Sequence, residues 1–209
     1  MFITFEGPEG CGKTSRIAEL TKVLCDQGYD VLATREPGGT PIGDQIRDIL
    51  LDLTNTAMQP RTEILLFQAS RSQLVDQVIR PHLARGGVVL SDRYADSTLA
   101  YQGYGYQQDL DVLRSIVGFA TGGLAPDLTL LLDLDVEVGL RRRAGDGGWN
   151  RLDDYDLAYY ERVRRGYLEM AGAEPARWQV IDAAQPPEVV QAAVRTIVME
   201  RLLRKESSG

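Results

Sequence analysis

Residues 2–14 read FITFEGPEGCGKT, and this stretch decides the fold class. The apolar run at residues 2–5 predicts a short buried strand. Residues 7–14 match the pattern G-x-x-x-x-G-K-S/T at every fixed position, and the residues that follow carry apolar side chains at helical spacing. A strand, a glycine-rich turn and a helix therefore come in the order that a phosphate-binding loop, the P-loop, requires.

The residue types of this loop suit a polyphosphate. Its glycines let several backbone N–H groups point into one concavity, and the N-terminus of the next helix adds its dipole. We expect Lys13 to reach the β- and γ-phosphates of a nucleotide, and the hydroxyl of Thr14 to ligate Mg²⁺. An ordinary glycine turn beside an exposed lysine is disfavoured by the flanking strand and helix. The candidate nucleotide-binding residues of the loop are Gly7, Pro8, Glu9, Gly10, Cys11, Gly12, Lys13 and Thr14.

Length and composition narrow the class of protein. The 209 residues fit one α/β domain, residues 1–209, better than two full domains. A net charge of −7 argues against a general nucleic-acid or anionic-membrane surface, so we expect neither as a partner. The sequence shows no signal-peptide pattern, no apolar run approaching 18 residues, and two cysteines without metal-ligand spacing, which together predict a cytoplasmic protein.

Four further strands are predicted along the chain, at residues 29–34, 88–90, 128–134 and 178–181. The fourth strand of the chain, LTLLLDL at residues 128–134, is almost entirely apolar, which indicates a parallel sheet covered by helices on both faces. The remaining residues 204–209 form a polar tail that we expect to fray. Helical patterns after the first helix cover residues 42–53, 62–83, 97–102, 110–119, 136–143, 156–170 and 187–203.

Charged residues follow two of the predicted strands. Asp92 and Arg93 come abruptly after the buried strand at residues 88–90, and Arg35 follows the strand at residues 29–34. Ligands of α/β proteins bind at the carboxyl ends of strands, so Asp92 and Arg93 are predicted to be functional. Arg35, at the start of a Pro-Gly-Gly loop, fits a ligand site or an ordinary surface turn.

Two further features fit a nucleotide site. Phe67 and Arg71 are four residues apart on a predicted helix and so share one face, where a ring and a guanidinium can stack on a base and bond its edge. Core packing of Phe67 is the alternative. Four arginines flank a glycine-rich segment at residues 141–152, which predicts a mobile cationic lid, with an exposed basic helix end as the alternative.

Together with the P-loop, residues 35–39 (REPGG), the group Phe67, Arg71 and Gln73, and residues 92–94 (DRY) resemble the thymidylate kinase family over residues 2–203. The resemblance implies a three-layer α/β P-loop NTPase fold, with a five-stranded parallel sheet, helices on both faces and a short arginine-rich lid. It also implies a homodimer and a reaction in which Mg²⁺ and ATP convert dTMP to dTDP for dTTP biosynthesis. A kinase for another nucleoside monophosphate or a nucleoside is the alternative.

The resemblance assigns roles on the donor side of the reaction. It implies that Lys13 and Thr14 serve ATP and Mg²⁺ and that Asp92 holds Mg²⁺ through water. Gln185 lies in residues 182–186 (DAAQP), which resemble the loop beside the donor adenine. Members of the family carry either a basic residue within the P-loop or a catalytic arginine in the lid. This P-loop contains no basic residue before Lys13, so the chain resembles the lid-arginine variant.

For the acceptor, the resemblance implies that Glu9 contacts the sugar and phosphate region and that Arg35 and Arg93 bind the phosphate. Phe67 would stack on thymine while Arg71 bonds its edge. The other expected substrate residues are Ser97, Thr98, Tyr101 and Gln102, with Tyr101 placed to exclude a ribose 2′-hydroxyl. Among the lid arginines we favour Arg143 and Arg151 for catalysis, then Arg142, which is also expected to bind ATP. The candidate catalytic residues are Glu9, Lys13, Asp92, Arg93, Arg143 and Arg151.

Two remaining hypotheses concern a different class of protein and a reactive cysteine. A P-loop switch protein would need a guanine-reading Asn-Lys-x-Asp, but Asn55 and Asn150 are the only asparagines and neither precedes a lysine. Cys11 lies near an anion-binding helix start, which suggests a sensitive thiol.

Overall fold

The structure of the chain, a computed structural model, describes residues 1–145, 150–153 and 155–206. The middle of the expected lid, residues 146–149, lies outside the described residues, and so do residue 154 and the end of the expected tail, residues 207–209.

Five parallel strands form one sheet in the order β2-β3-β1-β4-β5, which confirms the predicted sheet. The register brings the strand ends together at the carboxyl edge, where Asp92 of β3 pairs with Phe5 of β1 on one side and with Arg35 of β2 on the other. The strands are β1 (Phe2–Glu6), β2 (Val31–Arg35), β3 (Val88–Asp92), β4 (Leu128–Asp133) and β5 (Trp178–Asp182).

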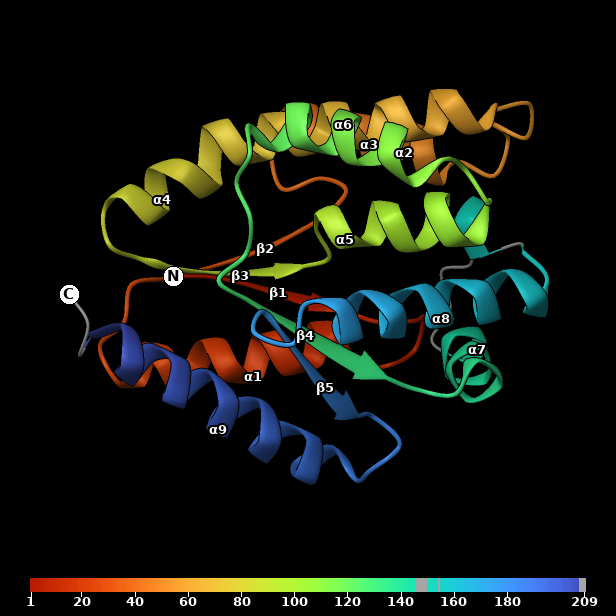
Figure 1. Cartoon of the computed structure of the whole chain (residues 1–209). Helices are drawn as coiled ribbons and strands as arrows, with labels where there is room; N and C mark the ends of the chain where they lie inside the picture. The colour runs from red at the N-terminus through yellow and green to blue at the C-terminus, as the bar shows by residue number, and fades with distance from the viewer. Residues whose placement is uncertain (146–149, 154, 207–209) are drawn as a thin grey trace.

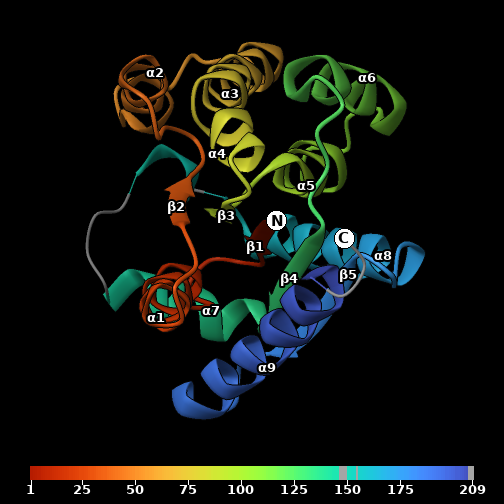
Figure 2. The same ribbon diagram turned by 90° about the vertical axis from the view of Figure 1, so that its left-hand side faces the viewer.

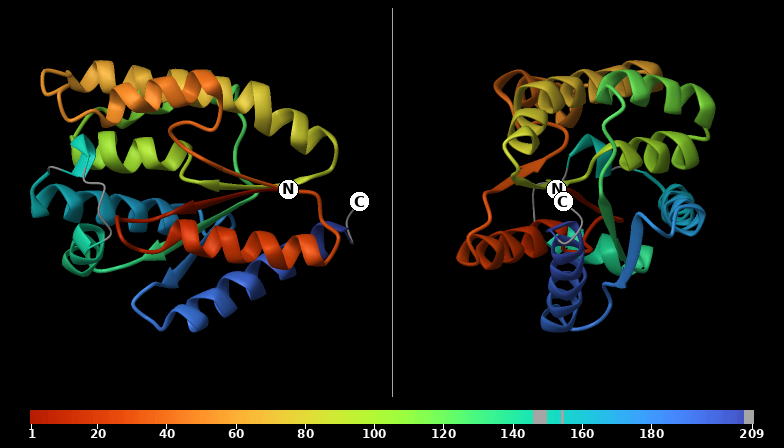
Figure 3. Two further views of the ribbon diagram at one scale, coloured as in Figure 1. Left: turned by 180° about the vertical axis from the view of Figure 1, so that it is seen from behind. Right: turned by 60° about the vertical axis from the view of Figure 1, so that its left-hand side comes forward.

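Helices cover both faces of the sheet, as predicted (Figure 1). In Figure 2, α1 and α9 lie on one side of the strands, while α2, α3 and α6 form a row on the other side, outside α4 and α5. The view from behind in Figure 3 shows α1 and α9 crossing the same side of the sheet. None of the helices in the described part of the chain could span a lipid bilayer. The helices are α1 (Lys13–Asp26), α2 (Pro41–Leu51), α3 (Pro60–Leu74), η1 (Val75–Ile79), α4 (Arg80–Ala84), α5 (Ala95–Thr98), η2 (Leu99–Gly105), α6 (Leu110–Thr121), α7 (Val136–Gly145), η3 (Arg151–Asp153), α8 (Leu157–Ala173) and α9 (Pro187–Glu206).

Two helices differ from the sequence prediction. The helix expected at residues 62–83 contains the π-helical turn η1, and Pro81 just after it lacks the N–H that an α-helix would use there. The helix expected at residues 97–102 continues to Gly105. It runs past Gly103 and ends at Gly105. A Cβ on them would come within 2.5 Å of Leu110 and 2.6 Å of Tyr159, so glycine serves close packing.

The alternation of side chains along β1 determines which face of the sheet each of them occupies, including Glu6 directly before the P-loop. Ile3 and Phe5 enter the core that α1 and α9 cover, whereas Phe2 packs with the core on the opposite face. Because successive side chains of a strand point to opposite faces, Thr4 and Glu6 share the face of Phe2. Glu6 is a fully buried carboxyl group at the end of β1, directly before the P-loop.

Candidate active site

The P-loop curls tightly between β1 and α1. Gly7, Gly10 and Gly12 all have positive φ, at 138°, 68° and 90°. At Gly10 a Cβ would collide with the carbonyl oxygen of Gly139 in α7, so only glycine fits. The ammonium group of Lys13 donates to the carbonyl oxygens of Gly7 (3.1 Å) and Pro8 (3.0 Å), inside its own loop.

Cys11 is buried in the same loop, with 4% of its surface exposed. Burial raises the pKa of its thiol, although Lys13 opposes that shift. Because the thiolate is the reactive form, the sensitive-thiol hypothesis for Cys11 loses its physical basis.

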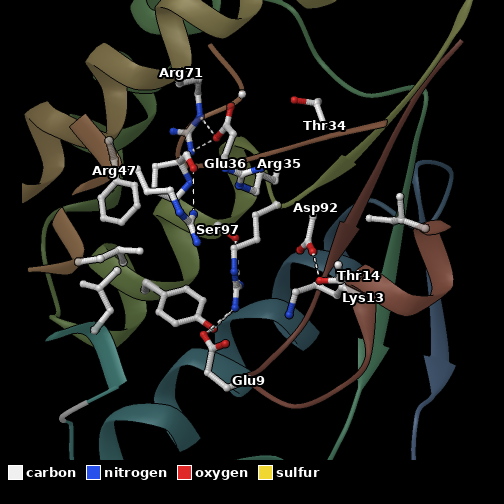
Figure 4. A pocket seen from close by; sticks show the side chains of 18 of the residues that line it. Glu9, Lys13, Thr14, Thr34, Arg35, Glu36, Arg47, Arg71, Asp92 and Ser97 are labelled. Atoms are coloured by element: carbon white, nitrogen blue, oxygen red, sulfur yellow. Dashed lines mark hydrogen bonds and ion pairs between the residues drawn. The ribbon is translucent and has the colours of Figure 1, made fainter. Parts of the chain in front are cut away.

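Thr14 and Asp92 meet at the start of α1 and the end of β3. The Thr14 hydroxyl donates to Oδ2 of Asp92 at 2.6 Å (Figure 4). Among the described residues, no group of three or more His, Cys, Asp or Glu side chains could hold a metal ion. A hydroxyl and one carboxylate nevertheless fit Mg²⁺, which is usually bound by one or two protein oxygens together with substrate phosphates and water.

One cavity of about 780 Å³ adjoins the P-loop and the carboxyl ends of β2 and β3. Its volume lies in the upper part of the range for small-molecule sites. Figure 4 shows Lys13, Thr14 and Asp92 on one side of it and Arg35, Glu36 and Arg71 on another. The cavity brings together most of the residues selected from the sequence, namely Glu9, Gly10, Gly12, Lys13, Thr14, Arg35, Phe67, Arg71, Asp92, Arg93, Ser97, Thr98, Tyr101, Gln102 and Arg143.

The two lid arginines favoured for catalysis have different surroundings. Arg143 lines the cavity. Arg151 instead donates to the carboxylate of Glu63 at 2.7 Å and to the carbonyl oxygen of Leu50 at 2.9 Å. The side chain of Glu63 is 2% exposed, so its charge needs a cation, and Arg151 supplies one. Arg151 does not line the cavity among the described residues, and its catalytic role stays a prediction.

The expected donor-adenine residues lie near β5. Arg142 reaches the carbonyl oxygen of Ala183 at 3.4 Å, and the amide of Gln185 donates to Asp182 at 2.8 Å. Neither of them lines the cavity among the described residues. The remaining residues selected from the sequence, Gly7, Pro8 and Cys11, belong to the P-loop but do not line the cavity among the described residues.

Arg93 is the centre of the polar network. One guanidinium nitrogen donates to Glu9 at 2.6 Å and to the Tyr101 hydroxyl at 2.9 Å. The other donates to the carbonyl oxygen of Gly7 at 3.2 Å and to the hydroxyls of Ser97 and Tyr167, both at 3.3 Å. Its backbone φ is +70°, which is strained for a residue with a side chain.

This network also sets the charge of Glu9. Burial alone would raise the pKa of that carboxyl, but Arg93, then Lys13 and the Tyr101 hydrogen bond, hold the pKa below its ordinary value. Arg143 acts in the same direction. Glu9 is therefore a stable anion that fixes Arg93 beside the P-loop.

Arg71 is deeply buried rather than free for a ligand. Only 1% of its side chain is exposed. Its guanidinium donates to Glu36 (2.7 Å), to Gln68 (2.7 Å) and to the Thr98 hydroxyl (2.8 Å). It also donates to the carbonyl oxygen of Tyr94 at 2.9 Å. The expected bond from Arg71 to a base edge would require one of these partners to be exchanged.

Sequence reasoning missed Arg47, which lines the cavity from α2. It donates to the carbonyl oxygen of Pro37 at 2.9 Å, and burial together with nearby Arg35 lowers its pKa. Figure 4 shows Arg47 and Arg35 among the side chains that line the cavity. The available signal was an arginine in the helix that follows the REPGG loop.

Sequence reasoning also missed Glu6. Its carboxylate accepts hydrogen bonds from the Tyr94 backbone N–H (2.8 Å), the Ser97 hydroxyl (2.6 Å) and the Tyr167 hydroxyl (2.8 Å). Burial, and then the charge of Asp96, raise its pKa to about 7. The available signal was a glutamate that ends an apolar strand immediately before the P-loop.

Comparison with known proteins settles the family. The sequence pattern of the thymidylate kinase family matches residues 5–194 of this chain. The chain belongs to the thymidylate kinase family. It is similar to the thymidylate kinase of Herpetosiphon aurantiacus, with 52% identity over 208 residues and 88% of each chain covered. It is also similar to that of Thermomicrobium roseum, with 53% identity over 208 residues, 99% of this chain and 98% of the relative.

A solved structure agrees with this family. The crystal structure of thymidylate kinase from Ehrlichia chaffeensis is 31% identical, with a TM-score of 0.78 over 95% of this chain and 98% of that chain. These likenesses confirm the family and the P-loop fold expected from the sequence. As a member of the thymidylate kinase family, the chain is an ATP-dependent phosphotransferase.

Proposed function

We propose that this chain transfers the γ-phosphoryl group of Mg·ATP to dTMP and yields dTDP and ADP. The observation that carries the proposal is the single cavity in which the P-loop and the acceptor residues meet, with Arg93 joined to Glu9 between them. The acceptor phosphate is already ionised near neutral pH, so the reaction needs no strong base. Positioning and neutralisation of charge supply most of the catalysis.

On the donor side, the P-loop backbone and Lys13 bind the phosphates of ATP. Lys13 gives up its bonds to the Gly7 and Pro8 carbonyl oxygens when phosphate oxygens replace them. Thr14 and Asp92, already 2.6 Å apart, would hold Mg²⁺. The ion, when bound, supplies positive charge against the β- and γ-phosphates. Arg142 and Gln185, near β5, are proposed to flank the donor adenine.

On the acceptor side, Arg35 and Arg93 bind the phosphate of dTMP, and Arg47 adds a third positive charge at the same end of the cavity. Phe67 offers its ring to thymine, and Thr98 and Gln102 line the base pocket with Arg71 behind them. Arg143 is the lid arginine that we assign to the transferring phosphoryl group. It lines the cavity, and its charge helps to lower the pKa of Glu9.

The acceptor is tested by ADP release from Mg·ATP with a panel of dTMP, dUMP, dCMP, dGMP, AMP and UMP. Turnover dominated by dTMP supports the proposed pocket. Turnover dominated by AMP or dGMP would keep the P-loop chemistry and overturn the thymine pocket of Phe67, Thr98 and Gln102.

We propose a homodimer that forms through α2, α3 and α6, which lie in one row (Figure 2). Phe119 is 89% exposed on α6, and Val112, seven residues earlier, lies on the same face of that helix. Ile49 on α2 and Leu65 on α3 are further exposed apolar side chains in this row of helices. A second copy of the chain covers it, since self-complementary faces form closed dimers.

Light scattering of purified protein tests the dimer. Phe119→Glu is expected to convert a dimer of about twice the chain mass to a monomer. Val189→Glu, at an apolar position of α9 that is 49% exposed, is the control and is expected to stay dimeric. A monomeric wild-type protein would overturn the proposal.

The remaining partners we propose are small molecules in the cytoplasm, with no nucleic acid or membrane. The net charge of −7 supports this, because it disfavours anionic surfaces. Retention of the purified protein on a heparin or anionic-vesicle column at low salt would contradict it.

A further inference from the structure

Glu6 is a fully buried carboxyl group to which the proposed reaction gives no role. It ends β1 on the face that α5 and α8 cover, and 0% of its surface is exposed. Its Oε1 accepts from the Tyr94 N–H, and its Oε2 accepts from the hydroxyls of Ser97 and Tyr167. All three neighbours act as donors, so the arrangement is built for an ionised carboxylate.

Two of these donors also serve Arg93. One nitrogen of the Arg93 guanidinium lies 3.3 Å from the Ser97 oxygen and 3.3 Å from the Tyr167 oxygen. A hydroxyl has one hydrogen to donate and two lone pairs to accept with. The Ser97 and Tyr167 oxygens also lie 2.9 Å apart, where either hydroxyl could donate to the other. When both instead give their hydrogen to Glu6, the lone pairs of both oxygens are left for Arg93. Glu6 therefore sets the direction of two hydroxyls that come from different helices.

We infer that Glu6 is a positioning residue for Arg93: its carboxylate orients the Ser97 and Tyr167 hydroxyls so that both accept from the guanidinium between the donor and acceptor sites. This inference rests on the proposed function, in which Arg93 binds the transferring and acceptor phosphates. Glu6 is fully buried and does not line the cavity among the described residues, and it reaches the guanidinium only through Ser97 and Tyr167.

The charged neighbours of Glu6 make its hydrogen bonding to Ser97 and Tyr167 sensitive to pH. Asp96 faces it from α5 and is itself paired with Arg177 at 2.6 Å. Arg93 faces it from the end of β3, and Tyr167 from α8. Burial and Asp96 together raise the pKa of Glu6 to about 7, against the opposing influence of Ser97, Arg93 and Tyr167.

A proton on Glu6 would change the hydrogen bonding of Arg93. The protonated carboxyl becomes a donor, so the Ser97 or Tyr167 hydroxyl must turn its hydrogen elsewhere and present fewer lone pairs to the guanidinium. Since the ionised form is the active one, kcat is expected to rise with pH through an apparent pKa near 7, the value set by burial and Asp96.

The test compares wild-type protein with Glu6→Gln, measuring kcat and both KM values with Mg·ATP and dTMP from about pH 5.5 to about pH 9. Glu6→Gln is expected to lower kcat about tenfold or more at alkaline pH, to change the KM for ATP less than about twofold, and to remove the rise near pH 7. The phosphate of dTMP titrates equally in both reactions, so only the difference between the two profiles reports Glu6.

Two further variants separate positioning from general destabilisation. Thr4→Val is the matched control, since Thr4 is buried on the same strand and face and bonds Thr129 at 3.0 Å rather than Arg93. It is expected to lower the melting temperature and keep the wild-type pH profile. Tyr167→Phe removes one of the two hydroxyls with little change of shape, and is expected to lower kcat about two- to tenfold.

Retention of wild-type kcat and of the rise near pH 7 in Glu6→Gln would overturn the inference. Absence of wild-type turnover with dTMP would overturn the proposed function instead. The inference is then decided by NMR of the Arg93 side-chain Nε–H signal. That signal is expected to shift with pH near 7 in the wild type and to stay constant in Glu6→Gln. If the Arg93 Nε–H signal depends on pH in the same way in both proteins, the inference is overturned. This readout also decides the inference if Glu6→Gln is inactive.

Discussion

Oε1 of Glu9 in the P-loop lies 2.6 Å from a guanidinium nitrogen of Arg93, which follows β3. The two side chains are only 25% and 16% exposed, so the pair is shielded from solvent more than a surface ion pair. The loop that binds the donor phosphates is therefore joined directly to the cation that we assign to the acceptor phosphate.

Arg93→Ala should remove that cation from the reaction. We expect kcat to fall by about 10³-fold or more, the range seen when an arginine that stabilises a transferring phosphoryl group is lost. Steady-state kinetics with Mg·ATP and dTMP check this. Arg165→Ala, which removes an exposed arginine of α8, is the control and should leave kcat unchanged. A loss of less than tenfold would remove Arg93 from the catalytic role.

Phe67→Ala should weaken acceptor binding and spare the donor. Phe67 lines the cavity on α3, away from the P-loop, and loss of a base–aromatic stack costs about 1–3 kcal/mol. Calorimetric titration should show weaker binding of dTMP by that amount and unchanged binding of ATP. If the affinity for ATP fell and that for dTMP did not, the base pocket would be wrongly assigned.

Asp92→Asn should raise the Mg²⁺ requirement. Asp92 contributes the only carboxylate bonded to Thr14 in the described part of the chain. We expect the Mg²⁺ concentration at half-maximal rate to rise about 10–100-fold, the typical effect of losing a group that supports a metal. Asp76→Asn, at an exposed position of η1, is the control. An unchanged Mg²⁺ requirement would contradict the proposed metal position.

Glu36→Ala should destabilise the fold. It leaves the guanidinium of Arg71 buried without its 2.7 Å partner, and breaking such a buried pair costs about 3–5 kcal/mol. Urea unfolding measures the change in the free energy of unfolding. Asp111→Ala breaks an exposed pair with Arg114 on α6 and should cost less than about 1 kcal/mol. Equal effects of the two substitutions would refute the claim that the Arg71 pair is desolvated.

The raised pKa of Glu6 also predicts how stability depends on pH. The folded protein keeps a proton on Glu6 up to about pH 7, whereas the unfolded chain releases it near its ordinary value of 4.5. The folded state binds more protons in that window, so the free energy of unfolding falls as pH rises from about 4.5 to about 7. The shift corresponds to about 3 kcal/mol at most.

Urea unfolding of wild type and Glu6→Gln at several pH values isolates this contribution, because all other groups titrate in both proteins. The stability of the wild type relative to Glu6→Gln should decline through the window. A constant difference would mean that the pKa of Glu6 is not raised. The ionised form needed to position Arg93 thus costs stability.

Local patterns accounted for most of the fold and much of the site. The strand, P-loop and helix at residues 2–24 follow from spacing alone. Asp92 and Arg35 were predictable as neighbours because the carboxyl ends of parallel strands meet at one edge, and the register of β1, β2 and β3 confirms this. Gly103 lies inside η2, which shows that a glycine needed for close packing has the same sequence signal as a helix end.

The missed residues and the pairing of Arg151 depend on distant partners. Arg151 pairs with Glu63, 88 positions away, and nothing local reveals that this buried carboxylate attracts it. Glu6 bonds Ser97 and Tyr167, which are 91 and 161 positions away. Arg47 is one charged side chain in a helix with other charges, so no spacing distinguishes it before the helix is placed against the cavity.

The most direct test of the central claim is ³¹P NMR of the products formed from Mg·ATP and dTMP by the purified protein. We predict that dTDP and ADP appear in equal amounts and that Arg93→Ala nearly abolishes both. ADP formed together with inorganic phosphate and no dTDP would show an ATPase that does not use dTMP, and would contradict the account.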